Sequence, residues 1–240
     1  MSDTLPYVLT GYGLPHLMGY LPTKNGDFHA NPLSPTQLLN SAQEMELAGI
    51  EIPLDRLAPV FDGKVAEVKG DIDELIAGLR ERNMQIVADY GVIVDQSADH
   101  LRDYLRLAAR TGVKVVRAML STLLCGDRRP MSGGWDSRLD ATVARLQEVL
   151  PLAQDLGICI AVENHQDAST EDLLRLFDRV NCSSAFGITL DTGNPLSVGE
   201  EPVETARALA PIIRHIHLKD YTIHFAPEGY HLVRCTWRDC

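Results

Sequence analysis

The chain has 240 residues, of which 45% are hydrophobic and 23% are charged, and its formal net charge is −11. This composition predicts a globular protein with room for one large domain, since α/β barrels commonly reach this length as a single domain. The acidic balance and the lack of a Lys/Arg-rich block argue against a nucleic-acid partner. No segment approaches the roughly 18 apolar residues of a membrane helix, so we also expect no membrane association.

The cysteines and the N-terminal segment favour the cytoplasm. The 5 cysteines are odd in number and lack CxxC spacing, which is typical of free thiols in a reducing compartment. The segment "MSDTLPYVLTGYGLP" lacks the basic start and the long apolar run of a signal peptide. We therefore expect a cytoplasmic protein.

Short apolar strands alternate with amphipathic helices along the chain. Ser34 and Ser97 are suited to starting helices, and Gly49, Gly112 and Gly157 are suited to ending them. We expect strands near residues 7–12, 50–53, 86–90, 114–119, 158–163, 187–191 and 214–219. We expect helices near residues 35–48, 71–82, 97–110, 136–156, 170–180 and 201–210. This alternation predicts parallel βαβ units.

The number of units exceeds a simple doubly wound domain and falls one short of an eightfold barrel. We therefore predict a single α/β domain over residues 1–240 with a TIM (β/α)8-type barrel fold. The barrel is expected to be incomplete, with seven strands and the eighth βα unit missing. Two segments, "CGDRRP" (125–130) and "HFAPEGYH" (224–231), are predicted to be loops at the rim of this barrel.

Ionisable side chains stand at the ends of three consecutive predicted strands. Glu163 ends "ICIAVE", Asp191 ends "GITLD", and His217 lies near the end of "RHIHLKD". Residues two apart in a strand share a face, so Glu163 and Asp191 share a face with small residues such as Ala161 and Gly187, and the same alternation places His217 on the inner face. Because barrel chemistry gathers at the C-terminal ends of the strands, we expect the three side chains to meet at one rim.

Two carboxylates and an imidazole at one point would need compensating positive charge. One divalent cation supplies it, and the oxygen-rich set favours Mn²⁺ or Mg²⁺, with Co²⁺ or Zn²⁺ as alternatives. The competing interpretation is that Glu163 and Asp191 form ion pairs with Arg117 or Lys219 and hold no metal.

Several neighbouring side chains have both a functional and a structural interpretation. His165 is either a catalytic or substrate-contacting group or a hydrogen-bonded loop histidine. Lys219 is either an electrophile or an ion-pair partner. Arg117 either clamps a hydroxyl, carboxylate or phosphate of a substrate or neutralises Glu163.

Further candidates lie on neighbouring segments. Asn194, in "ITLDTGN", and Glu51, at the end of the second predicted strand, are candidates for substrate binding. His215 is expected to be structural. Arg128 and Arg129 either attract an anionic substrate or are solvated surface charges.

The ordered set "IAVENH", "ITLDTGN" and "HIHLKDY" resembles the sugar phosphate isomerase/epimerase family of xylose isomerase-like TIM barrels over nearly the whole chain. In that family one metal is held by a Glu, an Asp and a His on the fifth, sixth and seventh strands and by a Glu on the eighth. The first three correspond to Glu163, Asp191 and His217. The fourth has no counterpart, because the chain ends at "TWRDC" and residues 237–240 look like an unrelated ending, as in a truncated member.

The resemblance implies a divalent-metal-dependent isomerase or epimerase. Its substrate would be a sugar, a sugar phosphate or a related hydroxy-ketone, from which a proton next to the carbonyl is removed to form an enediolate. Glu163, His165 and Lys219 are then the catalytic candidates. The alternatives are a metal-dependent dehydratase (a lyase) of a keto-polyol and an inactive, truncated sugar-binding barrel. The implied partner is a small-molecule carbohydrate, and a homo-oligomer is left open.

Overall fold

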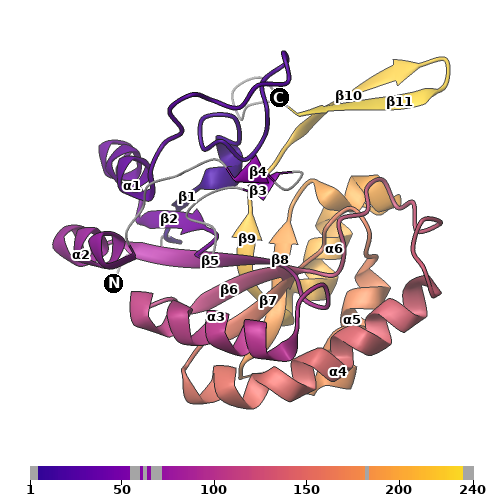
Figure 1. The fold of residues 1–240 in the computed structure, drawn as a ribbon. Coiled ribbons are helices and arrows are strands. Elements are labelled where there is room, and N and C mark those ends of the chain that lie inside the picture. Colours follow the sequence, from indigo (N-terminus) through magenta and orange to yellow (C-terminus); the bar gives the residue numbers. More distant parts are fainter. Residues whose placement is uncertain (1–4, 55–59, 62–63, 66–71, 182–183, 235–240) are drawn as a thin grey trace. The chain divides into compact units, whose positions relative to one another are not determined.

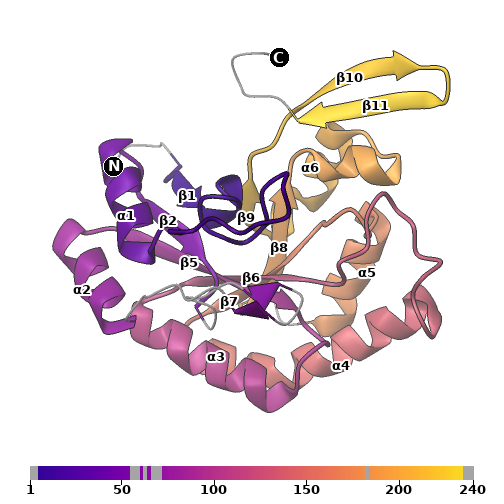
Figure 2. The same ribbon diagram turned by 45° about the horizontal axis from the view of Figure 1, so that its top comes forward.

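The computed structural model describes residues 5–54, 60–61, 64–65, 72–181 and 184–234 (Figures 1 and 2). The unusual ending at 237–240 lies outside these residues. The strands are β1 (Val8–Thr10), β2 (Gly49–Ile52), β3 (Val60–Phe61), β4 (Lys64–Val65), β5 (Gln85–Val92), β6 (Val115–Met119), β7 (Cys159–Glu163), β8 (Phe186–Asp191), β9 (Ile213–His217), β10 (Tyr221–Ala226) and β11 (Gly229–Arg234). The α-helices are α1 (Pro35–Glu44), α2 (Ile72–Arg82), α3 (Ala98–Thr111), α4 (Gly134–Asp155), α5 (Thr170–Val180) and α6 (Pro202–Leu209).

Seven strands form one sheet in the order β1-β2-β5-β6-β7-β8-β9. The pairs β1/β2, β2/β5, β7/β8 and β8/β9 are parallel. Strands that follow one another in this sheet are therefore neighbours, with helices in the connections, as βαβ units require. The predicted α/β fold with seven barrel-type strands is confirmed.

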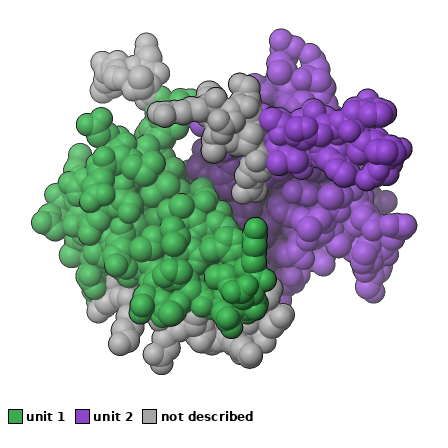
Figure 3. All heavy atoms as spheres, turned by 90° about the horizontal axis from the view of Figure 1, so that it is seen from above, with its two compact units in different colours: residues 1–91, 99–116, 156–158 green, residues 92–98, 117–155, 159–240 purple. Residues whose placement is uncertain are grey.

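The chain divides into two compact units, which Figure 3 distinguishes by colour. The first unit comprises Met1–Gly91, Asp99–Val116 and Leu156–Ile158, and the second comprises Val92–Ala98, Arg117–Asp155 and Cys159–Cys240. The domain boundary at 1–240 stays a prediction. We describe each unit by itself.

In the first unit, helix α1 begins as the sequence indicates but ends earlier. The Ser34 hydroxyl accepts a hydrogen bond from the Gln37 N–H, and the Gln37 side chain accepts one from the Ser34 N–H, which together form a capping box. The helix ends at Glu44, and Glu46 adopts a left-handed conformation (φ 57°). Gly49, predicted to end this helix, is instead the first residue of β2. A Cβ atom there would lie 2.0 Å from the Gln85 carbonyl oxygen, so close strand packing explains this glycine.

In the second unit, α4 contacts β7 and α5 contacts β8. Every residue of β8 is buried, and so are Leu173 and Leu176 on α5. Burying an aliphatic side chain of this size stabilises a fold by about 1.5–3 kcal/mol. Ser169 caps α5 through a second capping box, in which its hydroxyl accepts from the Asp172 N–H. Packing and capping thus fix the segment between β7 and α5, which carries several candidate site residues.

The segment 224–231, predicted to be a loop, is mostly a β-hairpin. Strands β10 and β11 pair antiparallel along their whole length, from Tyr221 opposite Arg234 to Ala226 opposite Gly229. Only the turn between Ala226 and Gly229 is outside the strands. Ile223 and Phe225 alternate with polar residues, which is a strand pattern that the Pro and Gly signals of the turn obscured.

Helices that could cross a lipid bilayer are not found among the residues that the structure describes. The cytoplasmic location stays a prediction.

Candidate active site

Three predicted ligand residues lie together in the second unit. Glu163 ends β7, Asp191 ends β8, and His217 ends β9, where it is paired in register with Asp191. One potential ligand atom from each of the three lies within 4.8 Å of the others. Glu163 and Asp191 are each 2% exposed, and the His217 side chain is 19% exposed. The parallel register of the strands therefore delivers two buried carboxylates and an imidazole to one point.

Both carboxylates also face basic side chains. Arg117, in β6, forms an ion pair with Glu163 through its Nη2 atom, and Lys219 Nζ lies 2.6 Å from Asp191 Oδ2. The Arg117 and Lys219 side chains are only 9% and 17% exposed. The formal charges of these four groups cancel, which makes the burial of the two carboxylates tolerable.

The environment of Glu163 keeps it ionised. Burial raises the pKa of this carboxyl, but the charge of Arg117 and the contact with His217 lower it by more, so the pKa lies well below its ordinary value. The His217 Nδ1 atom is 3.6 Å from Glu163 Oε1. An ionised carboxylate is the form that ligates metal ions.

Asn194 connects the two charge pairs. Its Nδ2 atom donates to Glu163 Oε1 over 3.3 Å, and its Oδ1 atom accepts from Lys219 Nζ over 3.0 Å. Asn194 is 1% exposed. The preceding Gly193 leaves space for this arrangement, because a Cβ atom there would lie 2.4 Å from the Tyr221 ring and 3.2 Å from Lys219 Cδ. In this geometry Asn194 positions other site residues, and its substrate-binding role stays a prediction.

Two side chains extend the parallel ladder beyond the strand ends. Asn164, which is 3% exposed, accepts from the Asp191 N–H over 2.6 Å and donates to the Asp191 carbonyl over 3.1 Å. Thr192 accepts from the Lys219 N–H over 2.9 Å and donates to the Lys219 carbonyl over 2.7 Å. Each side chain satisfies both backbone groups of a site residue, Asp191 at the end of β8 and Lys219 just after β9. The main chain of Asp191 and Lys219 is therefore fixed from the side.

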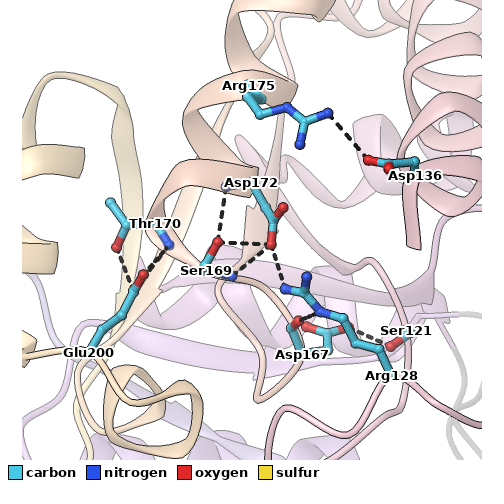
Figure 4. A network of polar contacts seen from close by, with 9 residues as sticks. All are labelled: Ser121, Arg128, Asp136, Asp167, Ser169, Thr170, Asp172, Arg175 and Glu200. Carbon is cyan, nitrogen blue, oxygen red and sulfur yellow. Dashed lines mark hydrogen bonds and ion pairs between the residues drawn. The ribbon is translucent and has the colours of Figure 1, made fainter. Parts of the chain in front are cut away.

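A third buried carboxyl lies on the loop that carries His165. Asp167 is fully buried, and its Oδ2 atom accepts from the Ser121 hydroxyl over 2.5 Å (Figure 4). Burial raises the pKa of Asp167, and the Ser121 hydrogen bond offsets this only in part. Within the described residues, Asp167 Oδ1 and His165 Nδ1 are buried without a hydrogen-bond partner. Both groups can therefore accept or donate a further hydrogen bond.

Arg128 ties together the loops that follow β6 and β7. Its Nε atom donates to the Asp167 carbonyl over 2.8 Å, and its Nη2 atom pairs with Asp172, which also accepts from Ser169 (Figure 4). The guanidinium carbon lies 4.0 Å from the centre of the Trp135 ring. We call Arg128, Asp167 and Asp172 the loop clamp. Arg128 is thus a structural cation, whereas Arg129 is exposed and pairs with Asp127.

The remaining candidates are Glu51 and His215. Glu51 is buried in β2 of the first unit, and its substrate-binding role stays a prediction. His215 packs edge-on against His217, with ring centroids 5.1 Å apart. Sequence reasoning did not single out Asn164, Asp167 or Ser121, although two of them belong to the polar run "ENHQD" that follows a buried strand.

The donor set fits one divalent cation. Two carboxylates and an imidazole within 4.8 Å of one another offer oxygen and nitrogen ligands that suit Mg²⁺ or Mn²⁺. Asn164 and the Gly193 N–H, which donates to Asp191 Oδ1 over 3.1 Å, orient the Asp191 carboxylate. Such supporting hydrogen bonds are typical of metal sites.

Comparison with known proteins identifies a relative in sequence. A decarboxylase of Pectobacterium atrosepticum, 3-oxo-isoapionate decarboxylase, is 28% identical over 59% of this chain and 49% of its own length, so the chain spans about half of that relative.

Two solved structures share the fold. D-allulose 3-epimerase from Methylomonas sp., in complex with D-allulose, has a TM-score of 0.66 at 16% identity and covers 90% of this chain and 72% of its own. A xylose isomerase-like TIM barrel protein from Mycobacterium smegmatis, in complex with magnesium, has a TM-score of 0.64 at 17% identity and covers 98% and 82%.

A family model described as xylose isomerase-like TIM barrel matches residues 39–237, which is most of the chain. The matched range contains β2 to β9 and all of Glu163, Asp191 and His217. The chain therefore belongs to the xylose isomerase-like TIM barrel family.

Proposed function

We propose that the chain is a divalent-metal-dependent isomerase or epimerase of a sugar, a sugar phosphate or a related hydroxy-ketone. The observation that carries this proposal is the convergence of Glu163, Asp191 and His217 at the ends of three neighbouring parallel strands. Membership of the xylose isomerase-like family and the fold shared with a sugar epimerase support it.

Glu163, Asp191 and His217 would hold the cation, with Mg²⁺ or Mn²⁺ as the preferred ions and Co²⁺ or Zn²⁺ as alternatives. A bound divalent cation supplies positive charge that polarises a carbonyl and stabilises the negative charge left when a neighbouring proton is removed.

The residues of the site have separate proposed roles in the reaction. Glu163 would hold the cation, and it stays a candidate for proton transfer together with His165. His165 is the better candidate for moving the proton, because its buried Nδ1 atom has no partner within the described residues. Lys219 and Arg117 present positive charge toward the same point and would stabilise an anionic substrate group or a developing oxyanion.

A second candidate function is a lyase reaction at the same site. The relative that is a decarboxylase favours it, because it matches 59% of this chain. Loss of carbon dioxide or water from a keto acid or keto-polyol also develops negative charge next to a carbonyl. The same residues would therefore serve both reactions, and product analysis separates them.

Hydrogen exchange from solvent tests the proposal. Purified protein with Mn²⁺ is incubated with a panel of hydroxy-ketones, phosphorylated and free, in deuterated water, and deuterium at the carbon next to the carbonyl is measured by mass spectrometry. We expect exchange with at least one substrate. His165→Gln should lower the exchange rate by about 10²-fold or more while leaving bound Mn²⁺ unchanged.

The control is His29→Gln, at an exposed position in the first unit. Exchange that is unaffected by His165→Gln contradicts the assigned base. Loss of carbon dioxide or water from the panel points to the lyase instead. No exchange and no elimination, with or without Mn²⁺, would leave the proposed function unsupported.

A further inference from the structure

Lys219 lies next to Asp191, a proposed metal ligand, and contacts with three residues fix its position. Its ammonium group lies 2.6 Å from Asp191 Oδ2 and donates to Asn194 Oδ1 over 3.0 Å. Its backbone N–H and carbonyl are both bonded to the Thr192 side chain. With a side chain that is only 17% exposed, Lys219 has little freedom to turn away into solvent.

Both oxygen atoms of the Asp191 carboxylate already have a partner. Oδ1 accepts from the Gly193 N–H over 3.1 Å, and Oδ2 faces the ammonium group. A divalent cation that binds Asp191 must therefore share this carboxylate with Lys219, and two cations next to one buried carboxylate repel each other strongly. Because Thr192 anchors the lysine backbone, the repulsion cannot be relieved by moving the whole segment.

Without Lys219, Asp191 would be a carboxylate that is 2% exposed and lies within 4.8 Å of a second carboxylate ligand. Removing one partner of a buried ion pair is strongly destabilising. The lysine therefore has two opposite effects. It stabilises the protein when no cation is bound, and it weakens the binding of a cation.

We infer that Lys219 is a built-in counter-charge that competes with the divalent cation for Asp191 and so sets the metal affinity of the site. This inference rests on the proposed function, because it assumes that Glu163, Asp191 and His217 hold the cation. It adds that the site is tuned to bind the cation less tightly than its ligands alone would allow.

Lys219→Met tests the inference, since methionine keeps much of the aliphatic stem and removes the charge. Mn²⁺ binding is measured by isothermal titration calorimetry after chelator treatment, and Tm is measured with EDTA and with excess Mn²⁺. We expect Lys219→Met to bind Mn²⁺ about tenfold more tightly than the unmodified chain. In EDTA its Tm should fall by about 5 °C or more.

Two further variants isolate the charge. Lys219→Arg keeps the positive charge and therefore keeps the repulsion of the divalent cation. Its affinity for Mn²⁺ should remain within about threefold of that of the unmodified chain, well short of the tenfold change expected for Lys219→Met. Lys24→Met removes a charge from an exposed lysine in the first unit and should change neither quantity.

The outcomes separate this inference from the proposed function. If the unmodified chain binds Mn²⁺, Asp191→Asn abolishes binding, and Lys219→Met binds no more tightly, the counter-charge inference is overturned and the metal site stands. If neither the unmodified chain nor Lys219→Met binds Mn²⁺, the metal site fails and the inference fails with it. Tighter binding by Lys219→Met together with a lower Tm in EDTA supports both.

Discussion

Asn164→Ala should destabilise the protein and disturb the Asp191 side of the site. The Asn164 amide satisfies both the N–H and the carbonyl of Asp191, at 2.6 and 3.1 Å, and it is 3% exposed. Alanine removes both hydrogen bonds, and water does not readily replace them in a buried position.

The size of the effect follows from these two bonds. A buried backbone group left without its partner costs about 1–3 kcal/mol, and the two groups share one small volume. We therefore expect the free energy of unfolding to fall by about 2–4 kcal/mol. For a chain of this length that corresponds to a Tm decrease of about 4–16 °C.

Urea unfolding followed by circular dichroism measures the change, with Asn25→Ala, at an exposed position of the first unit, as the matched control. Asn164→Asp keeps the acceptor, loses the donor and places negative charge against the Asp191 carbonyl, so it should be at least as destabilising as alanine. A surface substitution usually changes the free energy of unfolding by no more than about 0.5 kcal/mol. If the free energies of unfolding of Asn164→Ala and its control differ by less than this, the two hydrogen bonds to the Asp191 backbone contribute no stability and the prediction is wrong.

Other residues of the same unit give further predictions. Asp167→Asn should stabilise the protein at neutral pH: because burial raises the pKa of Asp167, folding favours its protonated form, and stability is lost as the pH rises through that pKa. Its advantage over the unmodified chain, measured as Tm, should therefore widen as the pH rises from the ordinary aspartate pKa to the raised pKa of Asp167 and stay level above it; a difference in Tm that is constant over this whole range, or that narrows, contradicts the assigned cause. Arg128→Met opens the loop clamp and should lower the free energy of unfolding by about 1–3 kcal/mol, since it leaves the buried Asp172 carboxylate without its cation. Arg129→Met, which breaks an exposed pair with Asp127, should leave the urea unfolding midpoint unchanged, and equal effects of the two substitutions would remove the distinction between the two arginines.

The main site residues could be predicted because a strand has only two faces. Alternation places Glu163, Asp191 and His217 on one face of their strands, and parallel strands bring their C-terminal ends together. The helix-glycine-strand repeats predicted the seven strands, and the order of the strands in the sheet agrees with them.

The supporting residues could not be predicted by the same rule. Asn164 has the opposite parity to Glu163, so alternation assigns it to the outer face. Beyond the strand end, however, its amide turns toward the Asp191 backbone. Whether Arg117 and Lys219 pair with the carboxylates depends on distances of a few ångströms, which spacing in the sequence does not determine.

Two predictions of local structure were wrong because Gly and Pro residues were assigned the wrong structural role. Gly49 looked like a helix terminator, yet the helix ends at Glu44 through a left-handed Glu46, and Gly49 is needed for the close approach of two strands. The Pro and Gly residues of "APEG" suggested a loop where they make only the turn of the hairpin between β10 and β11.

The most direct measurement is Mn²⁺ stoichiometry by electron paramagnetic resonance on the unmodified chain and on the variants Glu163→Gln, Asp191→Asn and His217→Ala. The proposed site predicts one tightly bound Mn²⁺ per chain and its loss in each of the three variants, while circular dichroism shows that they remain folded. Retention of one Mn²⁺ per chain in all three folded variants would contradict it, because the cation would then be held by other residues.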